Sequence, residues 1–373
     1  MLKILTAGES HGKSLLGIID GFPQGIYLDE DYINNELMRR QKGYGRSSRM
    51  EIERDQINIL SGIHKGYTTG NPISIMINNK GTNIDLVEIT KPRPGHGDLA
   101  GTLKYNHKGA RNILERASAR ETAMRVALGG LCKLFLKEFN IEICSHIIQI
   151  GNIKSKTNYY NNLKIEDLKA VDKSPLRVLD REKEKLMIKE IEKAKSMGDT
   201  LGGVMEVIGT GIPIGLGSHA HWDRKLDGKI AQGILSIPGI KGIEIGLGFS
   251  GANKLGSKYH DEIHYSNTFY RKTNNAGGIE GGISNGEAIV FRAIMKPIPT
   301  LRKPLKTVDL ESKENTVAQF ERSDVCAVPS ASIVAESVLA YILMKEFLIK
   351  FGGDSMEEIK ANYKNYINIL ENR

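Results

Sequence analysis

Cysteine is scarce in this chain of 373 residues, which has only Cys132, Cys144 and Cys326. They form no C-x-x-C pair and no Cys/His spacing typical of a metal site. The pair His219-x-His221 could chelate a metal, but no third ligand is evident, so we expect no metal site. A sparse, odd set of thiols favours a reducing compartment and excludes a disulfide framework. We therefore predict a cytoplasmic protein with buried, non-catalytic thiols.

Long hydrophobic runs are also absent. Nowhere do 18 apolar residues follow one another, which argues against a transmembrane helix. The first residues, MLKILTAGESHGKS, lack the charged and apolar regions of a signal peptide. We expect no membrane partner.

Aromatic residues make up only 6% of the chain and do not cluster with arginine. A module that binds single-stranded nucleic acid usually combines basic residues with stacking aromatics. The net charge of +8 (52 Lys+Arg against 44 Asp+Glu) nevertheless suits an anionic partner. A nucleic-acid module remains an alternative that would show steep salt-dependent affinity without turnover. We expect a small anionic molecule instead, and no nucleic acid.

The nucleotide-binding fingerprints are incomplete. No G-x-G-x-x-G follows a strand and opens a helix, so a Rossmann dinucleotide site is not indicated. Residues 7–14 (AGESHGKS) resemble a P-loop, but Ala7 replaces its first glycine. A P-loop also requires a helix directly after its lysine. The next residues, LLGIIDGFPQG, contain three glycines and a proline, which disfavour a helix. Tight ATP binding with hydrolysis would revive this alternative.

Glycine is abundant, with 40 residues gathered in runs such as GHGDLAG and GGIEGGISNG. Such loops allow positive φ and close approach of a ligand to the backbone. Between them, periodicity predicts strands and helices. The predicted strands are 2–6, 15–19, 57–63, 73–77 and 141–150. The predicted helices are 31–40 with Asp29 as N-cap, 112–139 with a weak break at Gly129-Gly130, 180–197, 222–236, 331–348 and 354–370.

One short segment occurs twice. Residues 21–26 (GFPQGI) are echoed by residues 211–216 (GIPIGL), and each copy follows a strand-like run and precedes a helical pattern. This indicates an internal repeat, although a match this short can also arise by chance. Because no Ser- or Pro-rich linker of useful length interrupts the chain, we predict a single domain over residues 1–373.

Two histidines and a set of arginines are the strongest candidates for chemistry. His11 and His96 lie in glycine-bounded loops, beside Ser10 and near Arg93 respectively, and histidine transfers protons near neutral pH. Arginine offers a planar, bidentate donor for phosphate and carboxylate, so several converging arginines predict a polyanionic substrate. The alternative for any one arginine is a salt bridge, for example to Glu115 or Glu121.

A series of segments resembles the chorismate synthase family. They are GESHGKSLLGIIDGFPQG, RRQKGYGRSSR, RPGHGDLAGTLKY, RASARETAMR, GGIEGGISNG, KPIPT and RSDVCAVPSASIVAE, and they follow the family's order. The resemblance implies an α+β fold in which a helical layer lies between antiparallel sheets, with an internal pseudo-twofold repeat. It also implies a homotetramer in the shikimate pathway of aromatic amino-acid biosynthesis.

The reaction implied is a redox-neutral 1,4-elimination of phosphate from 5-enolpyruvylshikimate 3-phosphate to give chorismate, which makes the protein a carbon–oxygen lyase. Reduced FMN is the implied cofactor, because a flavin can lend an electron and accept hydrogen where a side-chain base cannot remove an unactivated ring hydrogen. NADPH would enter only as the source of reducing equivalents. Since no dinucleotide fingerprint is present, we expect a separate flavin reductase to supply the reduced flavin.

The resemblance also implies roles for individual residues. His11 would protonate the departing phosphate, His96 would stabilise or protonate the reduced flavin, and Asp324 with Ser10 would relay a proton at the flavin. The implied substrate ligands are Arg40, Arg46, Arg49, Arg93, Arg120 and Arg322. The implied flavin contacts are Arg116, Ala117, Ser118, Gly281, Lys296, Pro297, Ile298, Pro299, Thr300 and Arg322.

The chain departs from the family pattern at two places. Pro238-Gly239 stands where many members have Asn-Ala or Pro-Ala, so an asparagine contact to the flavin is not available and these residues are left out of the site. Gly97 replaces a usual alanine in the RPGHGD loop, which we expect to be harmless.

Overall fold

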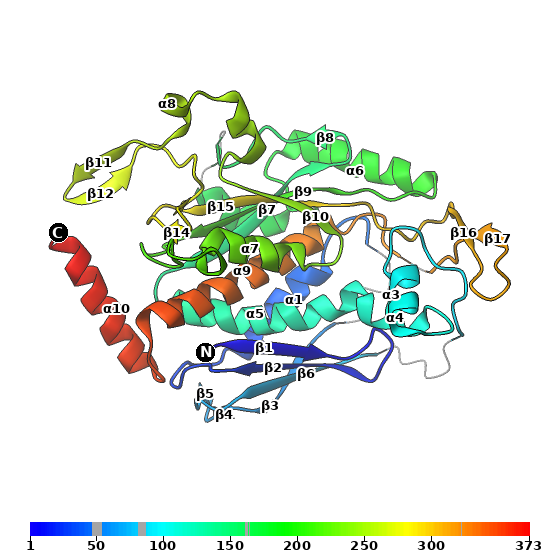
Figure 1. Cartoon of the computed structure of the whole chain (residues 1–373), viewed down its shortest axis with the longest axis horizontal. Helices are drawn as coiled ribbons and strands as arrows, with labels where there is room; N and C mark the ends of the chain where they lie inside the picture. The colour runs from blue at the N-terminus through cyan, green and yellow to red at the C-terminus, as the bar shows by residue number, and fades with distance from the viewer. Residues whose placement is uncertain (47–53, 81–86, 161–162, 164, 322) are drawn as a thin grey trace.

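The computed structural model describes residues 1–46, 54–80, 87–160, 163, 165–321 and 323–373. Two antiparallel sheets lie on either side of a layer of helices (Figure 1). The first sheet has the strand order β1-β2-β6-β3, and the second has the order β10-β15-β9-β7-β8. The α+β fold with a helical layer between antiparallel sheets, expected from the resemblance, is therefore confirmed.

The first sheet comprises β1 (Lys3–Ala7), β2 (Ser14–Asp20), β3 (Ile57–Ser61) and β6 (Ile73–Asn78). Side chains alternate along β2 between the core and solvent, so one face of the sheet covers the helices. Because residues 14–20 form a strand, the helix that a P-loop requires is absent from this described segment. The P-loop alternative is thereby excluded on structural grounds.

The second sheet comprises β7 (Glu142–Ile150), β8 (Ile153–Lys154), β9 (Gly203–Thr210), β10 (Ile240–Ile245) and β15 (Ile289–Met295). Short two-stranded hairpins extend from the layers. They are β4 (Ile63–His64) with β5 (Tyr67–Thr68), β11 (Ile263–Ser266) with β12 (Thr268–Arg271), β13 (Ile279–Glu280) with β14 (Ile283–Ser284), and β16 (Lys306–Val308) with β17 (Asn315–Val317).

The central helices are α1 (Glu30–Gln41), α5 (Thr122–Lys137) and α9 (Val328–Phe351). α9 is apolar around most of its circumference and is buried along most of its length, as expected for a helix enclosed on all sides. The predicted N-cap of α1 is confirmed, because the Asp29 carboxylate accepts a hydrogen bond of 2.9 Å from the Tyr32 amide.

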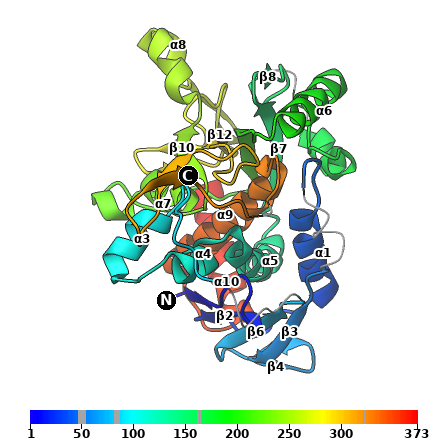
Figure 2. The ribbon, with the colours of Figure 1, turned by 90° about the vertical axis from the view of Figure 1, so that its right-hand side faces the viewer.

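The remaining helices surround this layer. They are α3 (Asp98–Tyr105), α4 (Arg111–Ala117), η1 (Ala119–Glu121), η2 (Ile165–Lys173), α6 (Arg181–Ser196), η3 (Trp222–Arg224), α7 (Leu226–Leu235), η4 (Gly248–Asn253), α8 (Gly256–Tyr259) and α10 (Met356–Glu371). In the view of Figure 2, α3 and α4 lie at one end of the layers, and α1 lies to the side of α5.

The predicted helix 112–139 is wrong in one respect, the position of its break. The chain leaves helical geometry at Ser118, between α4 and α5, and passes unbroken through Gly129-Gly130. A Cβ on Gly129 would lie 2.3 Å from the Ser337 Cβ, so this glycine lets α5 and α9 approach closely and does not end a helix.

The short echo in the sequence corresponds to two turns of the same conformation. Gly21 and Gly211 have φ of +76° and +73°, and Gly25 and Gly215 have φ of +96° and +103°. Each turn follows a strand, β2 or β9, and leads towards a helix, α1 or α7. The predicted internal repeat is therefore present in the structure. α10 contacts both turns, through Met356 N to Gln24 O and through Tyr366 Oη to Ile214 O.

Candidate active site

His11 is held by a carboxylate. The loop between β1 and β2 folds over α4, where His11 Nδ1 lies 3.0 Å from Glu115 Oε1 and the His11 amide donates to Glu115 Oε2 at 2.8 Å. Burial opposes ionisation of Glu115, but the hydrogen bonds from His11 outweigh it and lower the pKa of Glu115. An ionised carboxylate only accepts, so Nδ1 carries a proton and Nε2 is directed away from Glu115.

The residues next to His11 and Glu115 in the sequence also contact one another. The Ser10 amide donates to Glu115 O at 3.1 Å, and Ser118 Oγ lies 3.3 Å from Ser10 Oγ. Arg116 donates to the carbonyls of Gly8 and Thr6, each at 2.9 Å. The predicted flavin contacts at 116–118, which include Ala117 at the end of α4, therefore lie beside the loop that carries Ser10 and His11.

His96 has the same arrangement with a different carboxylate. Its Nδ1 lies 2.5 Å from Oδ1 of Asp98, the fully buried first residue of α3. Arg93 donates to Asp98 through Nε at 2.8 Å and through its amide at 3.0 Å. Burial opposes ionisation of Asp98, but the hydrogen bonds from His96 and Arg93 lower its pKa well below the usual range. Asp98 therefore accepts the Nδ1 proton of His96 and in this way fixes the orientation of the ring.

The predicted flavin segment 296–300 packs against this loop. Lys296 Nζ contacts the Gly95 carbonyl, and Arg93 Nη1 donates to Thr300 Oγ1 at 2.8 Å. Partial burial, followed by repulsion from Lys241, lowers the pKa of Lys296. Two neighbouring cations at this place would be relieved by an anionic ligand.

A second basic group forms where α1 ends. Arg40 donates to Thr122 Oγ1 at 3.0 Å and to Ala119 O at 2.9 Å, and Arg46 Nε lies 3.2 Å from Asp324 Oδ2. Burial, followed by repulsion from Arg46, lowers the pKa of Arg40 to about 10. Arg40 Nη1 is a buried donor without a hydrogen-bond partner among the described residues. Such an orphaned donor is typical of a site that receives an anion.

Arg120 is fixed by two residues that the sequence did not indicate. Its Nη1 lies 2.7 Å from both carboxylate oxygens of Asp55, and its Nε donates to Asn79 Oδ1 at 2.9 Å. Asp55 precedes β3 and Asn79 follows β6, and these strands pair antiparallel with Ile57 opposite Ile77. Asp55 and Asn79 are therefore neighbours across the sheet edge. Only the strand register, which the sequence pattern alone did not give, could have revealed them.

These groups are connected to one cavity of about 1610 Å³ through the residues that line it. Arg46, Asp55, Thr300 and Asp324 are among its lining residues, and Ser323 Oγ donates to Thr300 O at 3.0 Å. Asn79 joins the cavity to the His11 loop, because its amide group donates to the carbonyls of Glu9 and Gly12 at 3.1 and 2.7 Å. Segments far apart in the sequence thus form one basic site.

One predicted residue that the structure describes, Gly281, is not part of this cluster. Gly281 lies in the turn between β13 and β14, near His219, and precedes β15, whereas Lys296 follows the other end of that strand. β14 and α3 lie at opposite sides of the molecule in Figure 1. Arg49 and Arg322 lie outside the described residues.

Two carboxylate-held imidazoles are connected to this basic cavity, His96 through Arg93 and Thr300 and the His11 loop through Asn79, Arg120 and Asp55. Such an arrangement is typical of an enzyme that acts on a small polyanion. The family model "Chorismate synthase" matches residues 2–348. A chorismate synthase of Alkaliphilus metalliredigens is 54% identical over 383 aligned positions, covering 99% of this chain and 100% of that protein. A chorismate synthase of Carboxydothermus hydrogenoformans is 51% identical, with 100% of both chains covered.

A solved structure described as "Crystal Structure of Chorismate Synthase" is similar over 100% of this chain and 99% of that chain, with a TM-score of 0.83 and 42% identity. The chain belongs to the chorismate synthase family. Its function is that of this family: a carbon–oxygen lyase of the shikimate pathway that depends on a flavin. Among the described residues, none of the helices is long and apolar enough to span a membrane.

Proposed function

We propose that this chain converts 5-enolpyruvylshikimate 3-phosphate to chorismate by a 1,4-elimination of phosphate that depends on reduced FMN, and that the described cavity is where this occurs. The observation that carries the proposal is the buried Arg40 Nη1, which has no hydrogen-bond partner among the described residues, although Asp55 Oδ2 lies 3.9 Å away. Arg40 interacts electrostatically with Arg46, which lines the cavity. The substrate carries a phosphate and two carboxylates, which are the groups that arginine binds best.

Arg40 and Arg46 form the centre of the proposed substrate clamp. Arg93 and Arg120 are the further proposed substrate ligands, and their guanidinium groups are held in place by Asp98 and Asp55. Arg49 and Arg322 complete the clamp by analogy with the family and lie outside the described residues. Holding three anionic groups at once fixes the orientation of the ring, so that the phosphate leaves from one defined position.

His11 is the proposed acid for the departing phosphate. Glu115 holds the ring at Nδ1, so a proton on Nε2 is directed away from that carboxylate and can be given to the leaving group. The protonated ring also stabilises the charge that develops on the phosphate oxygen as the carbon–oxygen bond breaks.

The residues beside the cavity fit a flavin that carries a phosphate. The lowered pKa of Lys296 next to Lys241 marks a place where an anion relieves repulsion. Lys296 to Thr300 with Arg116, Ala117 and Ser118 would hold the cofactor, and His96 would stabilise its reduced form. When bound, reduced FMN supplies the transient electron that makes loss of the ring hydrogen feasible. Asp324 with Ser10 is the proposed proton relay. Gly281 is left out, because within one chain it lies away from these groups.

The wider setting is proposed from the resemblance. The whole chain would act as one domain, a homotetramer in the cytoplasm, with NADPH only as the source of electrons and a separate reductase delivering the reduced flavin. The three cysteines support a reducing compartment: they are free, and burial raises the pKa of the Cys132 and Cys326 thiols, the latter to about 11. Sedimentation at four times the chain mass of 41.2 kDa would support the tetramer.

The proposed site is tested with variants that should change substrate binding and FMN binding independently of each other. Arg46→Ala should raise the KM for the substrate by about 10- to 100-fold and leave the Kd for FMN nearly unchanged, because it removes a clamp residue. Lys296→Ala should weaken FMN binding and leave substrate affinity nearly unchanged at saturating flavin. Arg181→Ala and Lys360→Ala, which remove exposed ion pairs, serve as matched controls. If both ligands respond equally to both site variants, the assignment of two subsites is wrong.

A further inference from the structure

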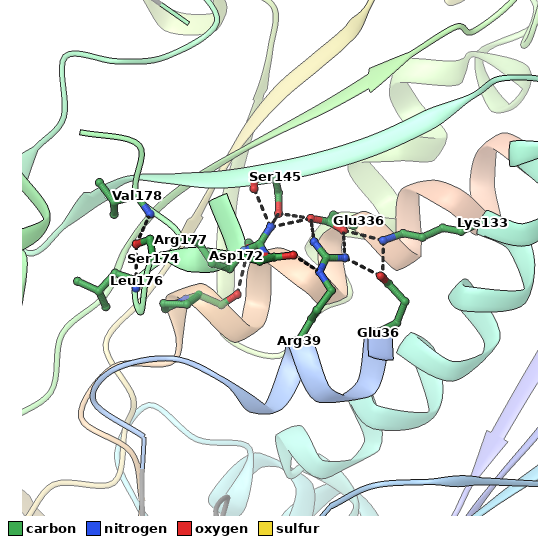
Figure 3. A network of polar contacts seen from close by, with 12 residues as sticks. Glu36, Arg39, Lys133, Ser145, Asp172, Ser174, Leu176, Arg177, Val178 and Glu336 are labelled. Carbon is green, nitrogen blue, oxygen red and sulfur yellow. Dashed lines mark hydrogen bonds and ion pairs between the residues drawn. The ribbon is translucent and has the colours of Figure 1, made fainter. Parts of the chain in front are cut away.

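An ionic network, buried for the most part, adjoins the substrate clamp (Figure 3), and its members Arg39, Asp172 and Arg177 also line the cavity. It joins Glu36 and Arg39 of α1, Lys133 of α5 and Glu336 of α9 with the segment that carries Asp172 and Arg177. Three cations therefore face three carboxylates. None of these residues belongs to the catalytic, substrate or flavin groups proposed above.

Glu336 is the hub of this network. It is fully buried, and it is bonded to all three cations: Arg39 Nη1 at 2.9 Å, Lys133 Nζ at 2.6 Å and Arg177 Nη2 at 2.9 Å. It also accepts a hydrogen bond of 2.6 Å from Ser145 Oγ in β7. Burial opposes its ionisation, but Arg39, Lys133 and Arg177 outweigh this and hold its pKa well below the usual range. The Glu336 carboxylate thus connects its own helix, α9, to α1, α5, β7 and the segment that carries Arg177.

Arg39 connects the network to the clamp. It immediately precedes Arg40, and successive residues of an α-helix point about 100° apart. Arg39 is fixed by Glu36 at 2.7 Å, Asp172 at 2.7 Å and Glu336, whereas Arg40 turns to Thr122 and Ala119 at the start of α5. Fixing the Arg39 side chain fixes the rotation of the last turn of α1 about its axis, and hence the direction of Arg40.

The same carboxylate also fixes the other side of the cavity. Glu336 lies in α9, which begins at Val328, shortly after Asp324. Arg177, which Glu336 holds, donates from Nε to Ser332 Oγ at 3.1 Å, one turn closer to that end of the helix. The start of α9, which positions Asp324 opposite Arg46, is therefore anchored by the same group that anchors α1.

We propose that Glu336 is a positioning residue for the substrate: through Arg39, Lys133 and Arg177 it holds α1 and α9 at the separation at which Arg40 and Arg46 meet one polyanion. The inference rests on the proposed function, because it concerns the affinity of the same site. It does not extend to the flavin, whose proposed contacts lie on α4 and on residues 296–300.

The test is the Glu336→Gln variant of the full chain, assayed anaerobically with 5-enolpyruvylshikimate 3-phosphate and reduced FMN. We expect KM for the substrate to rise by about 10- to 100-fold, kcat to fall by less than about 3-fold, and the Kd for FMN to stay within about 2-fold of wild type, because a displaced clamp loses binding geometry. A merely structural role predicts the opposite split: a smaller folded fraction lowers the maximal rate and the FMN stoichiometry together, with KM unchanged.

Glu346→Gln is the matched control. Glu346 is a buried carboxylate of the same helix, but among the described residues its ion-pair partner is Lys229, at 2.7 Å, which is not part of the clamp. It should leave KM unchanged whatever it costs in stability. If Glu336→Gln does not fold, Glu336→Asp keeps the charge but withdraws the carboxylate, and it should still raise KM relative to Glu346→Asp. A KM within about 2-fold of wild type in the folded Glu336 variant, or an equal rise in the Glu346 control, would overturn the proposal. Failure of the wild type to form chorismate would instead refute the proposed function.

Discussion

At the scale of single residues, the site repeats one device: a buried carboxylate holds an imidazole at Nδ1 and so decides the direction in which Nε2 points. Glu115 does this for His11 and Asp98 does it for His96. Because a carboxylate accepts but does not donate when ionised, it fixes both the tautomer and the orientation of the ring. The histidines therefore keep their orientation before any ligand binds.

The central residue prediction concerns His11 and its partner. His11→Ala should lower turnover by about 10- to 1000-fold while FMN binding largely persists, because a proton donor is lost and the flavin contacts remain. Glu115→Gln should lower turnover by about 10-fold, since the ring is still present but loses its charged acceptor. His64→Ala, a histidine of the β4–β5 hairpin, is the control. Full activity of His11→Ala would remove it from the mechanism.

The sequence motifs indicated the proposed catalytic and ligand-binding residues, but they did not indicate the residues that hold those side chains in place. His11, His96 and the arginines could be proposed because they stand in segments whose order of residues resembles the family. Asp55 and Asn79 could not, because they become neighbours only through the pairing of β3 with β6. Glu336 lies in a segment that reads as an apolar core helix, and nothing in the pattern shows that Lys133 and Arg177 surround it.

At the scale of elements, the sequence predicted most strands and helices, but it placed the break in the helix 112–139 at the wrong position. Glycine lowers helix propensity, so Gly129-Gly130 favoured a break there. The packing of α5 against α9 requires that glycine instead, since a side chain at Gly129 would collide with Ser337. The break occurs at Ser118, whose side chain accepts from the Arg120 amide and caps η1. The position of the break is therefore determined by tertiary contacts and not by the local helix propensity.

The two matching turns give a paired prediction for stability. Gly25→Ala should lower the free energy of unfolding by about 1 kcal/mol, because alanine disfavours the positive φ but its Cβ would make only an ordinary contact of 3.8 Å with Met356 Cβ. Gly215→Ala should cost more, because its Cβ would also lie 2.7 Å from Tyr366 Oη of α10. Urea unfolding of both variants measures the difference. Equal costs would show that α10 yields without penalty at this turn.

At the scale of the whole molecule, ionised carboxylates with lowered pKa values lie in two separate clusters. Asp98 and Glu115 are at the site, and Glu36 and Glu336 are in the ionic network. When the pH falls below about 4.5, these carboxylates become protonated in the unfolded chain but stay ionised in the folded chain, because their pKa values are lower there. Stability therefore rises with pH in this window and is lost on acidification. Each group contributes a slope of at most about 1.4 kcal/mol per pH unit.

This acid sensitivity is measured by urea unfolding between pH 3 and pH 7. We expect a plateau above about pH 5 and a decline below about pH 4.5, and Asp98→Asn should flatten the decline as well as lower the plateau. Asp223→Asn, which removes an exposed carboxylate, should leave both nearly unchanged. A wild-type stability that is constant down to pH 3 would contradict the assignment of these groups as ionised and paired.

The same arrangement of layers brings residues 10–11, 40–46, 93–98, 296–300 and 324 to one end of the molecule, where no single element could form the site. We propose that these residues catalyse a flavin-dependent elimination. An anaerobic assay that follows chorismate and inorganic phosphate together, with chemically reduced FMN and 5-enolpyruvylshikimate 3-phosphate, tests it most directly. We predict equal amounts of both products, formed only when reduced flavin is present. Phosphate release without chorismate, or turnover without reduced flavin, would contradict it.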